Sequence, residues 1–372
     1  MEKFDKLLKY GQSYWLDNLS REIITDGSLE NRIKNEGLRG ITSNPKIFMK
    51  AISGGELYDE QINDLADKGK KPEEIYEALA IEDIQKACDM MRPVFDESEG
   101  EDGFVSLEVS PYLARDTEKT KSEVRRLFKT VDRPNCMIKI PGTKEGIPAI
   151  EEMLYEGINI NITLLFSIDS YDAVAEAYLK ALERRAAEDK PINNIASVAS
   201  FFLSRIDVLA DKILLDEVIP SLKDEKKIMA ENLLGDVAIS SAKIAYKIFQ
   251  DKFGGERWNK LDAQGARVQR LLWASTSNKI ERYHDTRYVE PLIGPHTVNT
   301  MTDATIEAFK HHGTLLPNTI TEDIKKAHRV FHDLEVIGVR LEKITGQLVD
   351  EGIEKFVEPF DKLLNTIKQE AV

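Results

Sequence analysis

Short apolar or β-branched runs alternate with longer amphipathic stretches along most of the chain. The longer stretches repeat apolar residues at three- and four-residue spacing, as in SIDSYDAVAEAYLKALERRAAED at 167–189, and this spacing predicts helices. The alternation predicts consecutive βα units. We identify eight candidate strands, at 14–20, 37–45, 104–111, 136–142, 160–167, 194–202, 270–276 and 288–294. Eight strands with intervening helices predict an α/β fold of the (β/α)8 type, a closed TIM barrel.

A doubly wound open sheet is the main alternative fold. Such a sheet usually has fewer strands, and it often carries a Gly-rich phosphate loop after the first one. The sequence contains neither a GxGxxG pattern nor a Walker motif. The closed barrel is therefore the better interpretation.

Two intervals between candidate strands are longer than a βα crossover needs. Residues 46–103 hold at least two helical patterns, and residues 203–269 hold a long helical stretch. Neither has the Ser/Gly/Pro-rich composition of a flexible linker. We interpret both as helical insertions in a single domain spanning residues 1–372. The C-terminal segment near 319–370 is also helical in pattern, and a terminal helix pair packed across the barrel explains it more simply than a separate small domain.

Composition and net charge limit the classes of molecule that the protein can bind. Hydrophobic residues make up 42% of the chain and charged residues 31%, and the net charge is −14. That charge argues against nucleic acid or an anionic membrane as partner, although a few cations in a cleft can still bind a small anion. No run approaches the roughly 20 apolar residues of a membrane helix, and the N-terminus lacks a signal pattern. Cys88 and Cys136 fit neither a disulfide framework nor a metal cluster, so we expect a cytoplasmic protein.

Polar side chains gather where the predicted strands end, which is where barrel enzymes carry their active sites. Charge inside an apolar strand is costly and needs a reason. The polar residues in or just after the strands are Asp17 and Asn18, Thr42, Ser43 and Asn44, Glu108, Lys139, Asn161 and Thr163, Ser200, and Ser275.

Lys139 is the sharpest candidate because Met137, Ile138, Ile140 and Pro141 surround it. Its ammonium could point to solvent or pair with a buried carboxylate, which would make it a structural residue. Burial, however, lowers the pKa of lysines in general, and a neutral amine attacks carbonyl carbon. We therefore predict a Schiff base on Lys139.

An amine nucleophile also needs carboxylates to move protons. Glu108, one strand before Lys139, is placed to serve as acid–base group through a water. Asp17, on the first strand, suits the base that takes a proton from a substrate hydroxyl when a carbon–carbon bond breaks. Each is an ordinary salt-bridge or cap residue when taken alone, so the prediction rests on their appearance together with Lys139.

Five segments resemble one known family, the transaldolases. GITSNPKIF (40–48) resembles the family's second-strand signature, and MIKIPGTKEGIPAIEEMLYEGININITLLFS (137–167) resembles its block from the Schiff-base lysine to the Asn-x-Thr strand. SVASFFLSRID (197–207) resembles its Ser–Phe…Arg segment, and RLLWASTSNK (270–279) with YVEPLIGPHTVNTM (288–301) resembles its last two strands. The resemblance runs from about residue 10 to 310, and the chain length is similar to that of the bacterial subfamily of about 370 residues.

The resemblance implies a role for each matching residue. Lys139 would form the imine with a ketose phosphate, Glu108 would activate the water that Thr163 helps to hold, and Asp17 would be the base at the C4 hydroxyl. The substrate would be bound by Asn44, Asn161 and Ser200 at its three-carbon unit, by Ser275 along the sugar chain and by Arg205 at its phosphate. Where shorter relatives carry a second phosphate-binding arginine, this chain has Ser277–Asn278–Lys279, so Lys279 is the substitute we expect.

The implied reaction moves a dihydroxyacetone unit from sedoheptulose 7-phosphate or fructose 6-phosphate to an aldose phosphate, in the non-oxidative pentose phosphate pathway. The imine stores the electrons released on cleavage, so neither a metal nor an organic cofactor is expected. Two alternatives stay open: a Schiff-base aldolase of the fructose-6-phosphate type that releases free dihydroxyacetone, and a barrel that only binds sugar phosphates. The sequence leaves open whether the protein is a monomer or a homodimer.

The remaining candidate chemistry is weak. None of the six histidines has ligand-like spacing with cysteine or clustered carboxylates, and we interpret the pair in HHGT, His311–His312, as a solvated turn. The serines Ser200, Ser275 and Ser277 lack a histidine and aspartate in any triad order, which argues against a serine hydrolase.

Overall fold

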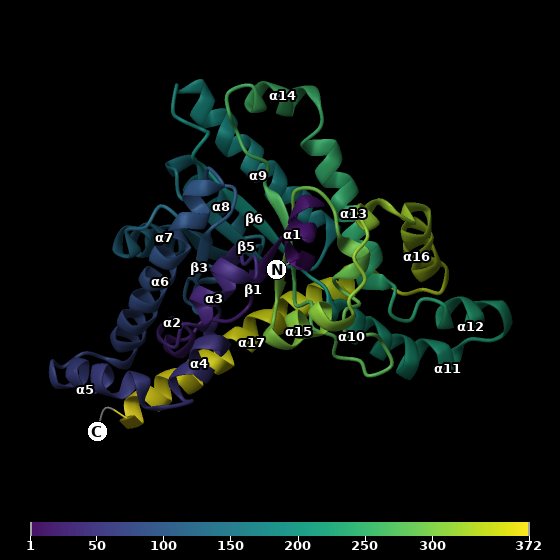
Figure 1. The fold of residues 1–372 in the computed structure, drawn as a ribbon. Helices are drawn as coiled ribbons and strands as arrows, with labels where there is room; N and C mark the ends of the chain where they lie inside the picture. The colour runs from purple at the N-terminus through teal and green to yellow at the C-terminus, as the bar shows by residue number, and fades with distance from the viewer. Residues whose placement is uncertain (1, 371–372) are drawn as a thin grey trace.

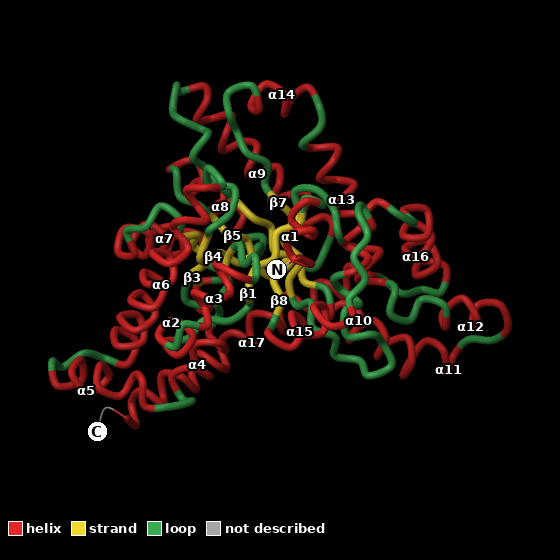
Figure 2. Tube along the Cα trace, in the orientation of Figure 1, coloured by secondary structure: helices red, strands yellow, loops and turns green. Residues whose placement is uncertain are grey.

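Eight parallel strands close into a barrel at the centre of the molecule, and helices surround it (Figures 1 and 2). The computed structural model describes residues 2–370. Each strand pairs with its neighbours in chain order, and β1 closes the ring against β8. The strands are β1 (Gln12–Leu16), β2 (Gly40–Ile41), β3 (Phe104–Glu108), β4 (Cys136–Pro141), β5 (Ile160–Leu165), β6 (Ser197–Phe202), β7 (Arg270–Ala274) and β8 (Thr297–Met301). The predicted (β/α)8 barrel is confirmed.

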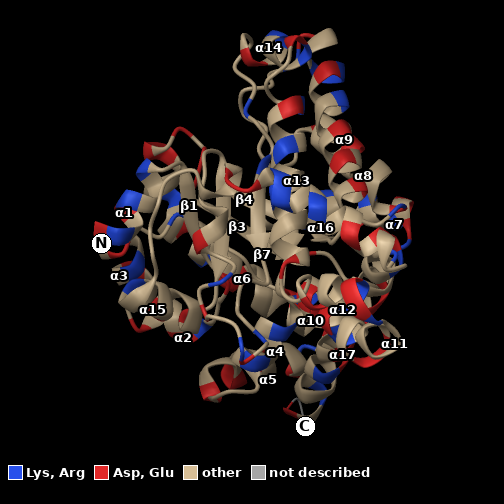
Figure 3. Cartoon of the chain, turned by 90° about the vertical axis from the view of Figure 1, so that its right-hand side faces the viewer, with Lys and Arg blue, Asp and Glu red and all other residues tan. Residues whose placement is uncertain are grey.

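Helices fill the intervals between strands and extend beyond them. The helices are α1 (Glu2–Lys9), α2 (Arg21–Thr25), α3 (Ser28–Asn35), α4 (Pro45–Ile52), α5 (Asp59–Asp67), α6 (Pro72–Glu97), α7 (Thr117–Val131), α8 (Gly146–Glu156), α9 (Ile168–Ala187), α10 (Ser204–Ile213), α11 (Ile219–Ser221), α12 (Asp224–Glu231), α13 (Val237–Lys252), α14 (Glu256–Asp262), α15 (Asp303–His312), α16 (Ile324–Val336) and α17 (Leu341–Glu370). Positions of Lys and Arg and of Asp and Glu are interspersed along the outer helices (Figure 3). Within residues 2–370, no helix combines the length and low charge that crossing a bilayer requires.

The eighth strand is not where the sequence pattern placed it. Residues 288–294 form no strand and contain the 3-10 turn η4 (Glu290–Leu292), whereas β8 begins at Thr297. Pro291 has no N–H for a strand ladder. The segment is nevertheless apolar because it packs against the barrel: the Leu292 carbonyl accepts hydrogen bonds from Gln12 Nε2 at 2.7 Å and Trp273 Nε1 at 3.1 Å. The apolar pattern of residues 288–294 therefore reflects burial outside the sheet, and the strand prediction for this segment was wrong.

The second strand is shorter than predicted, with two residues in place of 37–45. Asn44 ends the segment by capping α4: its side chain accepts from Ile47 N at 3.1 Å, and Pro45 occupies the first helical position. Gly40 is needed for a different reason. A Cβ at this position would lie 2.4 Å from the Trp15 ring, because the buried indole lies directly against the glycine.

The last helix closes over one end of the barrel. α17 packs against α4, α6 and α10, and Figure 1 shows it running beside α4 below the strands. α16, by contrast, packs against α13 on the side of the molecule. α17 therefore brings side chains from the C-terminal part of the chain to the end of the barrel where the strands finish.

Cys88 and Cys136, which seemed unrelated in the sequence, lie side by side as buried free thiols between α6 and β4. Their hydrogen bond, together with burial, raises the pKa of Cys88.

Candidate active site

Lys139 projects from β4 into the barrel interior. Its Nζ donates to the Ser43 carbonyl at 2.9 Å and lies 3.4 Å from Glu108 Oε2 on the neighbouring strand. Only 7% of the lysine side chain and 5% of the glutamate side chain are exposed. The strand register sets Lys139 directly between Glu108 and Asn161. Adjacent parallel strands thus hold the amine and the carboxylate at one level of the barrel.

The second oxygen of Glu108 has no partner. Within the described part of the chain, Glu108 Oε1 and Thr163 Oγ1 are both buried without a hydrogen bond. Burial raises the pKa of Glu108, and the Lys139 charge opposes that rise. A carboxylate whose pKa is raised is a stronger base than a free one, which suits a group that must take a proton and return it.

Asp17 follows β1 and forms a second carboxylate at the same end of the barrel. Thr42 donates to its Oδ1 at 2.9 Å. Desolvation raises the pKa of Asp17, whereas the charge of Lys139 and the Thr42 hydrogen bond lower it. Asp17 and Lys139 form no ion pair within 4.0 Å in residues 2–370. The lysine charge acts on Asp17 from a longer distance.

A small cavity of about 80 Å³ reaches Lys139 from a larger cleft of about 1000 Å³. Both spaces are lined by Asp17, Asn44, Arg205, Ser275, Thr300 and Phe356, so they are continuous. Lys139, Thr163 and Ser200 line only the inner cavity, and Lys279 lines only the outer cleft. The predicted residues that line these spaces are therefore arranged by depth, with the amine at the bottom. Glu108 lines neither space and meets the site through its 3.4 Å contact with Lys139.

Asn161 lies beside Lys139 but does not line the cavity. It accepts from Ser200 Oγ at 2.7 Å and donates to Ser106 Oγ at 3.0 Å, and the three residues are buried. This chain of hydrogen bonds crosses from β3 to β6 beneath the cavity. It holds Ser200 in place whether or not Asn161 also contacts a substrate.

The cationic residues Arg205, Lys46 and Lys279 line the outer cleft, and Arg205 also lines the inner cavity. Burial lowers the pKa of Arg205, whose Nη1 is another buried donor that lacks a partner among residues 2–370. Desolvation also lowers the pKa of Lys279, and the charges of Lys46 and Arg205 add to that effect. Because like charges repel, cations held this close favour an anion between them.

Ser275 lies directly after β7, in the left-handed region with φ of 54°. Its carbonyl accepts from Ser204 N at 3.1 Å, and the two hydroxyls lie 2.9 Å apart. These contacts tie the end of β7 to the start of α10, where Arg205 is the second residue. The backbone turn thus positions Ser275 and Arg205 together.

A buried ion pair at the opposite end of the barrel is a useful contrast. Arg270 donates to Asp102 at 2.9 Å, to Ser13 at 2.6 Å and to the Thr297 carbonyl at 2.8 Å. Both side chains of the pair are nearly fully buried. Within residues 2–370, neither side chain of this pair leaves a buried polar atom unpaired, in contrast to Thr163 and Arg205 at the cavity and Glu108 beside Lys139. The Arg270–Asp102 pair is therefore a fully hydrogen-bonded structural network.

Sequence patterns missed three residues of this site. Lys46 follows the Asn44–Pro45 cap and could have been noticed as a charge next to the strand end. Thr300 lies on β8 and was missed because that strand was misplaced. Phe356 comes from α17, and no local signal indicates that this helix reaches the cavity.

A buried amine beside a carboxylate, at the end of a barrel lined by cations, suits imine chemistry on an anionic carbonyl compound. Comparison with known proteins agrees with that class. The family model described as Transaldolase/Fructose-6-phosphate aldolase matches residues 14–367. A Transaldolase 2 of Nostoc punctiforme is 46% identical over 98% of this chain and 96% of its own length. Transaldolases of Trichodesmium erythraeum and Thermobifida fusca are 48% and 43% identical, over 96% and 97% of this chain and 95% and 96% of their own lengths.

The chain belongs to the transaldolase/fructose-6-phosphate aldolase family. The resemblance stated from the sequence motifs is confirmed over nearly the whole chain.

Proposed function

We propose that this protein is a transaldolase, a transferase that moves a dihydroxyacetone unit from a ketose phosphate to an aldose phosphate through a Schiff base on Lys139. The observation that carries the proposal is the Lys139 amine, buried at the bottom of the cavity 3.4 Å from Glu108. Relatives of 42% to 48% identity are named transaldolase, which favours transfer to an acceptor over release of free dihydroxyacetone.

Imine formation needs a proton acceptor and then a proton donor next to the amine. Attack of Lys139 on the ketose carbonyl gives a carbinolamine, whose hydroxyl must leave as water. Glu108 takes a proton from the amine side and returns one to the leaving hydroxyl, with Thr163 holding the water. The unpaired oxygens of Glu108 and Thr163 support this assignment.

Cleavage needs a base at the hydroxyl next to the breaking bond. Asp17 takes that proton, the aldose departs, and the electron pair of the broken carbon–carbon bond moves into the imine. Asn44, Ser200 and Asn161 hold the three-carbon unit, and Asn161 also acts through its hydrogen bond to Ser200. An acceptor aldose then reverses these steps. The scheme uses neither a metal ion nor an organic cofactor.

The phosphate lies between Arg205 and Lys279 at the cleft, with Ser275 along the sugar chain. Arg205 offers a rigid fork of donors, of which Nη1 is unpaired. Lys46 joins this set because its charge acts on Lys279. Two flexible lysines thus take the place of a second arginine.

A coupled assay with and without acceptor tests the function. A transaldolase cleaves fructose 6-phosphate at a negligible rate until erythrose 4-phosphate is added, whereas an aldolase releases dihydroxyacetone without it. Borohydride added with fructose 6-phosphate should add mass at Lys139 in both enzymes. If Lys139 stays unmodified, the protein is at most a sugar-phosphate binder and the proposal is wrong.

We further propose that the protein works in the cytoplasm, as a monomer or homodimer, without nucleic-acid or membrane partners. The net charge of −14 and the two buried free thiols support this setting. Size-exclusion chromatography with light scattering distinguishes the two oligomeric states.

A further inference from the structure

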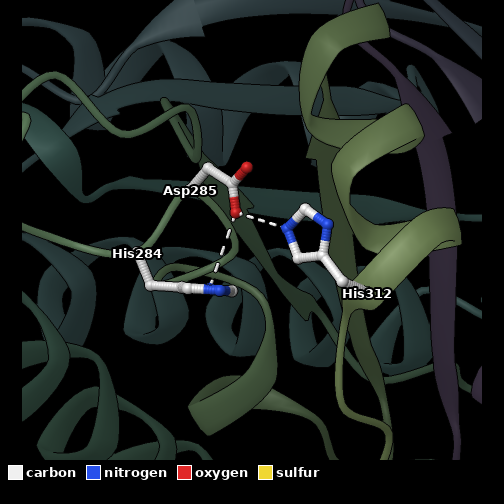
Figure 4. Close-up of side chains that lie close together, drawn as sticks. All are labelled: His284, Asp285 and His312. Carbon is white, nitrogen blue, oxygen red and sulfur yellow. Dashed lines mark hydrogen bonds and ion pairs between the residues drawn. The ribbon is translucent and has the colours of Figure 1, made fainter.

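His284, Asp285 and His312 form a cluster of exposed side chains (Figure 4). The first two lie in the connection between β7 and β8, and His312 is the last residue of α15. His312 Nε2 lies 2.8 Å from Asp285 Oδ1, and His284 Nδ1 lies 3.5 Å from the same oxygen. The HHGT segment was interpreted from the sequence as a solvated turn, but His312 ends a helix and faces a carboxylate 27 residues earlier in the chain.

The spacing of the three ligand atoms matches a metal coordination shell. One ligand atom from each residue lies within 4.8 Å of the other two. Zinc binds nitrogen and oxygen at about 2.0–2.2 Å with tetrahedral geometry, which places ligand atoms about 3.3–3.5 Å apart. The 3.5 Å separation fits that spacing, and the 2.8 Å hydrogen-bonded contact would lengthen when an ion replaces its proton. Small movements of exposed side chains are enough to complete the geometry.

We propose that His284, Asp285 and His312 bind a divalent transition-metal ion of the zinc class. Two imidazoles and one carboxylate suit Zn²⁺, Ni²⁺ or Cu²⁺, whereas Mg²⁺ and Ca²⁺ require oxygen ligands. The side chains are 60%, 56% and 47% exposed, so water completes the coordination shell.

Thr286 forms the hydrogen bond that an ion at His284 Nδ1 would replace. Thr286 Oγ1 lies 2.7 Å from His284 Nδ1 and donates its own proton to Glu290 at 2.7 Å. The Thr286 oxygen therefore accepts the Nδ1 proton. An ion bound at Nδ1 takes the place of that proton, the neutral ring then carries its proton on Nε2, and Thr286 keeps its bond to Glu290.

A bound ion would link the β7–β8 connection to the C-terminal end of α15. Among the described residues, the β7–β8 connection contains η4 as its only helix, and backbone bonds such as Arg287 N to the His284 carbonyl at 3.2 Å shape its turns. The same connection carries Ser277 and Lys279 at the cleft. A metal link from this connection to α15 is a structural clip, and it takes no part in the reaction at Lys139.

Zinc titration of the full-length protein against a chromogenic chelator tests the site. We expect one equivalent to bind with a Kd of about 100 µM or tighter. His312→Ala and Asp285→Asn should each weaken binding at least about tenfold. His311→Ala is the matched control, because this neighbouring exposed histidine lies on the same helix outside the cluster and should leave the Kd unchanged. Zinc should raise the Tm of the wild type and of His311→Ala only.

Two readouts keep a folding defect from being mistaken for a lost ligand. His312→Ala should keep the wild-type circular dichroism spectrum and the wild-type kcat without metal. Anomalous diffraction from a zinc-soaked crystal should show an ion within about 2.0–2.2 Å of the three ligand atoms. The proposal is overturned if no equivalent binds, if His311→Ala and His312→Ala weaken binding equally, or if the ion lies elsewhere.

Discussion

Glu108→Gln is the substitution that most directly separates chemistry from packing at the buried amine. Glutamine keeps the shape of the side chain and its ability to hydrogen bond, but it cannot take the proton that imine formation releases. Positioned acid–base groups contribute about 10²- to 10⁴-fold, and each tenfold is about 1.4 kcal/mol of barrier. We therefore expect imine formation to slow by about 10²- to 10⁴-fold, or roughly 3–5 kcal/mol.

Glu108→Gln also removes the Lys139–Glu108 ion pair, so the substitution can change stability as well as rate. At 3.4 Å and an effective dielectric constant near 20, the gross attraction between Lys139 and Glu108 is about 5 kcal/mol. Desolvation of both groups offsets much of that attraction. Loss of the carboxylate should therefore lower the Tm, and the rate must be measured well below the new Tm. Circular dichroism of each variant verifies that the fold persists.

The assay is rapid mixing with fructose 6-phosphate followed by borohydride, with the adduct on Lys139 quantified by mass spectrometry. Glu108→Gln should accumulate the adduct slowly. Asp17→Asn should form it at nearly the wild-type rate and yet fail to turn over, because Asp17 acts only in cleavage. Glu118→Gln, on the exposed face of α7, is the control for the substitution itself. Wild-type adduct formation in Glu108→Gln, or equal slowing in both active-site variants, would refute the assigned roles.

The remaining predictions concern the anion subsite, the strand packing and a buried carboxyl. Arg205→Ala should raise KM for phosphorylated sugars by about 10- to 100-fold and Lys279→Ala by a few-fold, since charged hydrogen bonds contribute about 1.5–3 kcal/mol and exposed charges less; steady-state kinetics measures both. Gly40→Ala should lower the unfolding free energy by about 1–3 kcal/mol in urea denaturation, because the new methyl group meets the Trp15 ring. Burial raises the pKa of Asp207 from 3.8 to about 7. The folded state therefore holds the proton more tightly than the unfolded state, its stability falls as pH rises from about 4 to 7, and Asp207→Asn should remove on the order of 4 kcal/mol of that fall in urea melts at several pH values.

Each of these predictions has a matched control. Unphosphorylated sugars should show a much smaller KM change in Arg205→Ala, and equal changes for both sugar classes would contradict the phosphate assignment. Gly346→Ala, on α17 with nothing within 4 Å of the new Cβ, should not destabilise the protein; a loss as large as that of Gly40→Ala would disprove the packing argument. An unchanged pH slope in Asp207→Asn would show that this carboxyl titrates normally.

Much of the fold was predictable from the sequence because βα units repeat a local pattern. Seven candidate strands overlap observed strands, although β2 is shorter than its pattern. The eighth prediction failed because residues 288–294 are buried against the barrel without joining the sheet. An apolar pattern indicates that a segment is buried, but a segment can be buried either within the sheet or against its outside.

The sequence by itself determined which chemistry is available. Lys139 and Asn161 stand within apolar strands, and Glu108, Asp17 and Asn44 stand at or just after strand ends. Since parallel strands of a barrel finish on one face, their order along the chain is enough to bring them together.

Only the tertiary structure decided what surrounds that chemistry. It brought Phe356 of α17 to the cavity, set Lys46 and Lys279 in one cleft, and placed His312 against Asp285. These contacts join segments that no local period connects. They depend on how helices and loops pack after the barrel has closed, so the same local patterns are compatible with many other arrangements.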